Sequence, residues 1–201
     1  RQRPQNNPVR TLNPAGDQLP GKAAYRQANP EKGSPESGSP FCFRLGGWLN
    51  MRLYLSSHRM GDSAGALLAM LGNARGTRAA VIANGFDGSS AAAREIYRAE
   101  VFDPHTILAS LGVAAESLDL RAYFGDGPGL RRRLAQFDLV WVMGGNAFVL
   151  RRAMKQSRFD GIIEDMLAAD AIIYAGDGAG AAVAGPTLRG MELLDDPWEL
   201  P

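Results

Sequence analysis

The sequence has little of what several classes of protein need. Its 201 residues include one cysteine, Cys42, and two histidines, His58 and His105. A single cysteine excludes an intrachain disulfide and fits a reducing compartment, so we expect a cytoplasmic location. The sequence holds no Cys/His cluster with metal-ligand spacing and no G-x-x-x-x-G-K phosphate loop. We therefore expect no metal and no cofactor.

Long apolar runs and a strong charge of one sign are also lacking. The apolar patch of residues 41–49 is short, is interrupted by Arg44, and is followed by no small-residue cleavage pattern. Residues 1–50 hold 7 of the 22 basic and 3 of the 21 acidic residues, which leaves 15 and 18, a net charge of −3, for residues 51–201. That balance gives no electrostatic reason to bind nucleic acid. We expect neither a membrane nor a nucleic acid as partner.

Residues 1–50 have the composition of a tail. Seven of the 12 prolines fall between Pro4 and Pro40, among Gln, Asn, Ser and Gly. Such a segment cannot bury enough apolar surface to offset its ordering entropy, which predicts disorder. Met51 directly precedes the first convincing strand, which indicates that residues 1–50 are upstream read-through. The alternative is a basic arm that binds an acidic partner.

Residues 51–201 alternate between strand-like and helix-like segments. The expected strands are residues 52–56, 79–83, 117–120, 139–143 and 171–175. The expected helices are residues 62–72, 89–111 (capped by Ser89 or Ser90 and interrupted near Asp103-Pro104), 129–136, 146–155 and 159–169. Because the strands are apolar without alternation, both faces of the sheet should be covered. The order predicts a flavodoxin-like α/β sandwich of three layers with a mainly parallel sheet.

Three loops of unusual composition follow expected strands, at residues 56–59, 144–146 and 176–180. Ligands of open α/β sheets bind beyond the carboxyl ends of the strands. The glycine-rich turn at 176–180, between an apolar strand and a helix of small residues, is typical of a nucleophile elbow, whose central residue has a strained backbone. The helix after the turn offers N–H groups to an oxyanion, and Gly144-Gly145 could add another N–H.

The stretches YAGDGAGAAVAGPTLRG, FDLVWVMGGNAFVLRRAM and MRLYLSSHRMGD resemble the elbow, the GGN-[TA]-F strand end and the opening strand of the dipeptidase E family of serine peptidases. The similarity covers about residues 51–201, the front portion of a family domain. It implies a class I glutamine amidotransferase-like fold and hydrolysis of small peptides, typically with an N-terminal aspartate, through a serine acyl-enzyme. The implied ligand is a small peptide. It also implies an oxyanion and binding site formed by Gly144, Gly145, Asn146 and Ala179.

The sequence departs from that family at the positions that carry the chemistry. The family's nucleophilic serine aligns with Gly178, and the bulky aromatic before it aligns with Asp177. The family's catalytic histidine lies beyond the elbow, whereas both histidines here precede it. Leu193 falls at the family's acidic position, although Asp195 and Asp196 lie nearby. No triad can be assembled from these residues, so we expect a truncated, catalytically inactive homologue.

Simpler interpretations exist for several of these residues. Gly178 is either the site of a lost nucleophile, which the GPTLR segment favours, or a plain turn glycine. Asp177 is either an aspartate nucleophile or, as its place beside the apex favours, a solvated turn residue. His58 is expected at the surface, and His105 has no evident partner in the sequence. Asn146 can cap the helix that follows it, contact substrate, or do both. The run Arg131-Arg132-Arg133 is expected on a solvated helix face.

Three hypotheses about function therefore stay open. The chain is an active peptidase, a non-catalytic homologue that retains a binding pocket at the elbow, or a non-functional fragment of a damaged gene. The oligomeric state is not predicted.

Overall fold

The computed structural model describes residues 51–201, and the tail predicted for residues 1–50 lies outside them. Five strands form one sheet in the order β1-β5-β4-β2-β3, and every neighbouring pair is parallel. The strands are β1 (Leu53–Ser56), β2 (Arg78–Ile82), β3 (Ala114–Ser117), β4 (Leu139–Val142) and β5 (Ile173–Asp177). The predicted α/β fold with a parallel sheet is confirmed.

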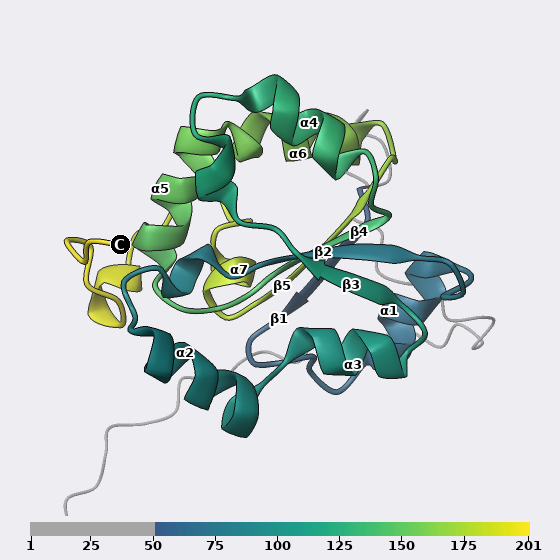
Figure 1. The fold of residues 1–201 in the computed structure, drawn as a ribbon, viewed down its shortest axis with the longest axis horizontal. Helices are drawn as coiled ribbons and strands as arrows, with labels where there is room; N and C mark the ends of the chain where they lie inside the picture. Colours follow the sequence, from purple (N-terminus) through teal and green to yellow (C-terminus); the bar gives the residue numbers. More distant parts are fainter. Residues whose placement is uncertain (1–50) are drawn as a thin grey trace, which may run out of the picture. The chain divides into compact units, whose positions relative to one another are not determined.

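Helices cover both faces of this sheet, as Figure 1 shows. The bounds of the α-helices are α1 (Ala64–Leu71), α2 (Ala91–Ile96), α3 (Pro104–Ser110), α4 (Gly127–Leu134), α5 (Ala147–Ser157), α6 (Phe159–Ala168) and α7 (Ala179–Ala182). A π-helical turn (Tyr97–Val101) extends α2, and short 3₁₀ helices lie at Asn84–Phe86, Leu120–Tyr123 and Met191–Leu193. Within residues 51–201, no helix combines the length and apolarity that crossing a bilayer requires.

Two apolar clusters, one on each face, hold the layers together. The first joins side chains of α4, α5 and α6 to strand residues such as Ile82 and Val142. The second joins α1 and α3 to Val81 and Trp141. Neighbouring residues of β2 and β4 thus serve opposite clusters, and all four residues of β4 are buried. This arrangement explains why the central strands are apolar without alternation.

Local signals place most element boundaries to within two residues. Ser90 caps α2 by accepting a hydrogen bond from Ala93 N, and Gly72 ends α1 with a φ of 69°. The break predicted near Asp103-Pro104 is the start of α3, whose N-cap is Asp103.

Two strands differ from the sequence-based prediction by more than one residue. The third strand is Ala114–Ser117 rather than residues 117–120, because the side chain of Asp119 caps a 3₁₀ helix that begins at Leu120. The last strand starts two residues later than predicted and continues to Asp177. In both cases pairing with a neighbouring strand sets the register, and local composition does not reveal that pairing.

Candidate functional site at the carboxyl end of β5

The chain turns sharply at Gly178, between β5 and α7. This glycine has φ 52° and ψ −116°, a conformation that L side chains rarely adopt. Tyr174 on β5 donates a hydrogen bond of 2.6 Å from its hydroxyl to Gly180 O, which fastens the start of α7 to the strand. The bend expected between Ala175 and Ala181 therefore exists, and it forms a strand–turn–helix.

The glycines of this turn differ in the space around them. A Cβ atom added at Gly176 would lie 2.6 Å from Gly180 C, and one added at Gly180 would overlap the carbonyl oxygen of Val142. A Cβ atom added at Gly178 would meet only Gly144 Cα at 3.6 Å and Ser57 O at 3.9 Å, which are ordinary contact distances. Close packing of α7 on the sheet thus requires glycine at 176 and 180. At Gly178, by contrast, there is room for a side chain.

The loop after β4 lies against this turn. Because β4 and β5 are neighbours in the sheet, their carboxyl ends bring Gly144 beside Gly178. Gly145 has a φ of 95°, and a Cβ atom there would lie 2.5 Å from Gly85 C, so the loop also packs closely on the segment after β2. Asn146 caps α5 by accepting hydrogen bonds from Phe148 N and Val149 N, as the capping interpretation predicted.

Asp177 corrects a prediction. It was expected to be a solvated turn residue, but it is the last residue of β5 and is only 2% exposed. Its carboxylate accepts hydrogen bonds from Trp141 Nε1 at 2.8 Å and from Gly144 N at 3.2 Å. Burial raises the pKa of this carboxyl above its ordinary value, against the opposing effects of these two donors and of the charge on His58. Asp177 thus fixes the loop after β4 to the turn.

A cavity of about 550 Å³ opens over the turn. Its wall includes Gly145, Gly178 and Ala179. The other lining residues come from β1 and the loop after it, from α7 and from the C-terminal segment: Leu55, Ser56, Ser57, Ala181, Ala182, Met191, Leu194 and Asp195. The N–H groups of Gly145 and Ala179 donate no hydrogen bond to another residue within 51–201. The cavity therefore combines an apolar wall with free backbone donors.

The C-terminal segment contacts the first turn of α5, which sequence reasoning did not foresee. Asp195 Oδ2 accepts a hydrogen bond of 2.8 Å from Ala147 N, and Asn146 Nδ2 donates to Glu199 Oε2 at 2.7 Å. Acidic side chains at a helix N-terminus accept hydrogen bonds from the unpaired N–H groups of the first turn. Their negative charge also interacts favourably with the positive end of the helix dipole. Leu193, aligned with the family's acidic position, is 85% exposed.

The two histidines and the arginine run are not among the residues that line this cavity. His58 is exposed in the loop after β1, as expected. Arg131 and Arg132 are exposed as predicted, but Arg133 stacks on Phe137 and pairs with Glu116. His105 does have partners, contrary to expectation: it contacts Asp103 and Ser117 at the other edge of the sheet. Among residues 51–201, no group of three or more His, Cys, Asp or Glu residues could hold a metal ion.

Known proteins resemble this chain in sequence. Two proteins named as uncharacterized peptidases, Lmo0363 of Listeria monocytogenes and Lin0382 of Listeria innocua, are 32% identical over 89 residues and 33% identical over 87 residues. The alignments cover 44% and 43% of this chain but 42% and 37% of those proteins. The chain therefore spans less than half the length of these relatives.

Solved structures share the fold. A peptidase E protein from Listeria monocytogenes superposes with a TM-score of 0.58 at 24% identity, over 72% of this chain and 66% of that one. A peptidase from an acI-B1 actinobacterium gives a TM-score of 0.50 at 18% identity, over 65% and 55%. Residues 89–201, which include the loop after β4 and the turn after β5, match peptidase family S51. This chain belongs to peptidase family S51.

Proposed function

We propose that the chain is a member of its family that binds a small peptide in the cavity at Gly178 without cleaving it. One observation carries the proposal: the turn has the backbone of a nucleophile elbow and space for a side chain, but residue 178 supplies no attacking atom. In subtilisin, removal of the serine nucleophile alone lowers kcat by about a million-fold. The same loss here leaves binding as the function that this cavity supports.

The cavity has the features that a peptide ligand needs. Its volume of about 550 Å³ lies within the range of roughly 300–1,000 Å³ of small-molecule sites. The N–H groups of Gly145 and Ala179 suit a carbonyl or carboxylate oxygen, and Leu55 and Met191 suit an apolar side chain. Family membership favours a short peptide, with an N-terminal aspartate as the first choice to test.

The proposal is tested by measuring binding and turnover on the same protein. The unaltered chain should bind aspartyl dipeptides in calorimetry or NMR titration and release no free amino acid from them. Ala182→Leu, which places a larger side chain in the cavity wall, should weaken binding at least tenfold. Ala184→Leu, at an exposed position outside the cavity, is the matched control and should leave affinity unchanged.

Gly178→Ser places a hydroxyl at the apex of the turn and so tests whether the lack of a nucleophile alone accounts for the lack of turnover. The added Cβ of Gly178→Ser meets only ordinary contacts, so the variant should fold and keep the binding site. We expect it to remain inactive or very slow, because no histidine has been identified as a base for it. If it gains turnover, His58 is the first histidine to test as a base, since it directly follows Ser57 in the cavity lining, and adding His58→Ala should abolish the gain. Turnover by the unaltered chain would disprove the proposal.

A further inference from the structure

A second group of chemically reactive side chains lies at the carboxyl end of β3, the edge strand of the sheet. Ser117 Oγ lies 3.0 Å from His105 Nε2, and His105 Nδ1 lies 3.2 Å from Asp103 Oδ1. Serine, imidazole and carboxylate thus form a hydrogen-bonded chain in the order that serine hydrolases use. Such a constellation is recognised by its geometry and not by its position in the fold or sequence. We call these three residues the β3 triad.

The first turn of α3 fixes the histidine and the carboxylate. Asp103 is the N-cap of this helix: its Oδ1 also accepts from His105 N at 3.1 Å, and its Oδ2 accepts from Thr106 Oγ1 at 2.7 Å. Burial would raise the pKa of Asp103, but the hydrogen bonds from Thr106 and His105 outweigh it and lower the pKa below the ordinary value. An ionised Asp103 accepts the proton of His105 Nδ1, which leaves Nε2 free to accept the hydroxyl proton of Ser117.

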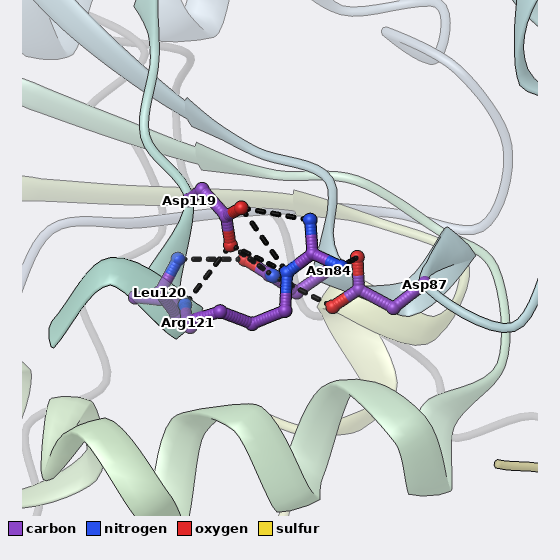
Figure 2. Close-up of polar contacts among 5 residues, drawn as sticks. All are labelled: Asn84, Asp87, Asp119, Leu120 and Arg121. Carbon is purple, nitrogen blue, oxygen red and sulfur yellow. Dashed lines mark hydrogen bonds and ion pairs between the residues drawn. The ribbon is translucent and has the colours of Figure 1, made fainter. Parts of the chain in front are cut away.

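The segment that follows Ser117 is held by the network in Figure 2. Asn84, which is 2% exposed, donates from Nδ2 to Asp87 Oδ2 and Asp119 Oδ1, both at 2.8 Å, and accepts from Leu120 N at 3.0 Å. Arg121 pairs with Asp119 and lies 3.4 Å from Asp87. These bonds join the segment that follows Ser117 to the segment that follows β2, so the end of β3 is held in place.

The backbone of Ser117 adds a possible oxyanion donor. Ala114 N donates to Thr77 O, just before β2, and Leu118 N donates to Val81 O on β2. Because N–H groups alternate in direction along a strand, the N–H of Ser117 points away from β2, toward the open edge of the sheet. In chymotrypsin-like enzymes the N–H of the nucleophilic serine itself is one of the oxyanion donors.

A cavity of about 400 Å³ gives access to Ser117. Its charged lining residues are three arginines and three acids: Arg94, Arg98, Arg121, Asp87, Glu95 and Asp119. The formal charges cancel, and Arg121 is already paired with both aspartates of the network. The cavity therefore has no net charge that would select an anionic or a cationic acyl group.

We propose that Ser117 is a nucleophile for acyl transfer from uncharged esters, with His105 as its general base and Asp103 as the positioning residue. Ser117 Oγ bonds to the ester carbonyl carbon while its proton passes to His105 Nε2. The intermediate collapses, the bond from carbon to the leaving oxygen breaks, and the proton on Nε2 passes to that oxygen. Water then attacks the acyl-serine by the same proton route, which releases the acid and restores Ser117. This site does not depend on the cavity at Gly178.

Covalent labelling of the full chain tests the proposal. An uncharged dialkyl fluorophosphonate should form one adduct, with loss of fluoride and a proton, and peptide mapping should place it on Ser117. Ser117→Ala should abolish the adduct. His105→Gln should slow labelling, and the hydrolysis of p-nitrophenyl acetate, by on the order of 100-fold, since general-base catalysis contributes 10²–10⁴-fold. Ser110→Ala, which removes an exposed hydroxyl on α3 that has no histidine contact, should change neither.

Asp103 both caps α3 and orients His105, so its test requires variants that keep the cap and lose the carboxylate. Asp103→Asn and Asp103→Ser both keep a good N-cap for α3, so both should fold with unchanged helix content. Both lose the carboxylate that orients His105, and each should slow labelling at least tenfold. A folded chain whose Ser117 stays unlabelled would overturn the proposal. So would labelling of Ser117 that persists at the same rate in His105→Gln or after denaturation in urea.

Discussion

The turn after β5 and the corner after β3 (residues 117–121) both lie at the carboxyl edge of the same sheet, but they present different chemical groups. The turn supplies backbone: a strained Gly178, N–H groups of Gly145 and Ala179 that have no acceptor within residues 51–201, and a mostly apolar cavity. The corner supplies side chains, with Ser117, His105 and Asp103 in hydrogen-bonded order. The fold therefore decides where a site can form, and individual side chains decide what chemistry each position has.

The two regions also differ in what holds them together. At the turn, backbone packs on backbone, with Gly176 and Gly180 as the points of contact. At the corner, a buried amide and three charged groups hold the loops through hydrogen bonds. Substitutions should therefore damage the turn through steric overlap and the corner through unsatisfied polar groups.

The largest effect is expected at Gly180. Gly180→Ala places a methyl group onto Val142 O. Because this oxygen belongs to the backbone of β4 and cannot rotate away, β4 or α7 must shift. We expect the free energy of unfolding to fall by about 3 kcal/mol, measured by urea denaturation. Gly161→Ala is the control: it is an exposed helical position with nothing within 4 Å of the added carbon, and it should gain up to about 1 kcal/mol. Equal effects of the two substitutions would argue against close packing of α7.

Loss of the buried side-chain amide of Asn84 should cause the next largest decrease in the free energy of unfolding. Asn84→Ala removes the acceptor for Leu120 N and the donor that Asp87 and Asp119 share, and it should cost about 2 kcal/mol. Asn73→Ala, which removes one exposed hydrogen bond to Arg75 N, should cost less than about 0.5 kcal/mol. If urea denaturation shows no difference between these variants, the network of Figure 2 does not stabilise the corner.

A smaller loss is expected at Gly178 itself. Gly178→Ala meets no steric overlap, so its cost should be only the strain of a positive φ, about 1 kcal/mol. Gly125 has a φ of 80° and open space around an added carbon, so Gly125→Ala should lose a similar amount. A loss above about 3 kcal/mol at Gly178 alone would show that the turn has no room for a side chain, and would weaken the interpretation of a lost nucleophile.

The smallest effects concern pH, and the two regions should respond in opposite directions. Hydrogen bonds from Arg121 lower the pKa of Asp119 to about 2, whereas burial raises the pKa of Asp177. The stabilisation from Asp119 is present above the ordinary carboxyl pKa of about 3.9 and is lost as the pH falls through about 2. The contribution of Asp177 is present below that ordinary value and is lost as the pH rises through its raised pKa.

Unfolding in urea between pH 2.5 and pH 7 measures both contributions. The stability of the unaltered chain relative to Asp119→Asn should increase with pH, and its stability relative to Asp177→Asn should decrease. Each variant serves as the control for the other. Parallel trends would contradict the opposite electrostatic surroundings of the two carboxyl groups.

Much of the architecture was predictable because its signals are local. The apolar runs of β2 and β4, the cap at Ser90 and the glycine that ends α1 are each read from a few neighbouring residues. The glycine-rich turn was predicted for the same reason. The third strand was placed too late in the sequence, because Ala-Ala-Glu-Ser carries little strand propensity and pairing with β2 selects it.

The side-chain partners were far less predictable. Asp177 was expected in solvent, but the indole of Trp141 reaches it from 36 residues away on the neighbouring strand. His105 was expected to lack a partner, although Ser117 lies only 12 residues further along. In both cases the contact depends on how α3, β3, β4 and β5 pack, and no periodicity in the sequence encodes that packing.

The sequence by itself determined the order of strands and helices, the position of the turn after β5, and the lack of a hydroxyl at residue 178. These properties depend on the identity of consecutive residues, so they can be predicted without knowledge of the tertiary structure. Only the tertiary structure buried Asp177 beneath the turn and brought Asp103, His105 and Ser117 into one hydrogen-bonded chain. Those arrangements depend on strand register and helix docking, which fix distances between groups that the sequence separates.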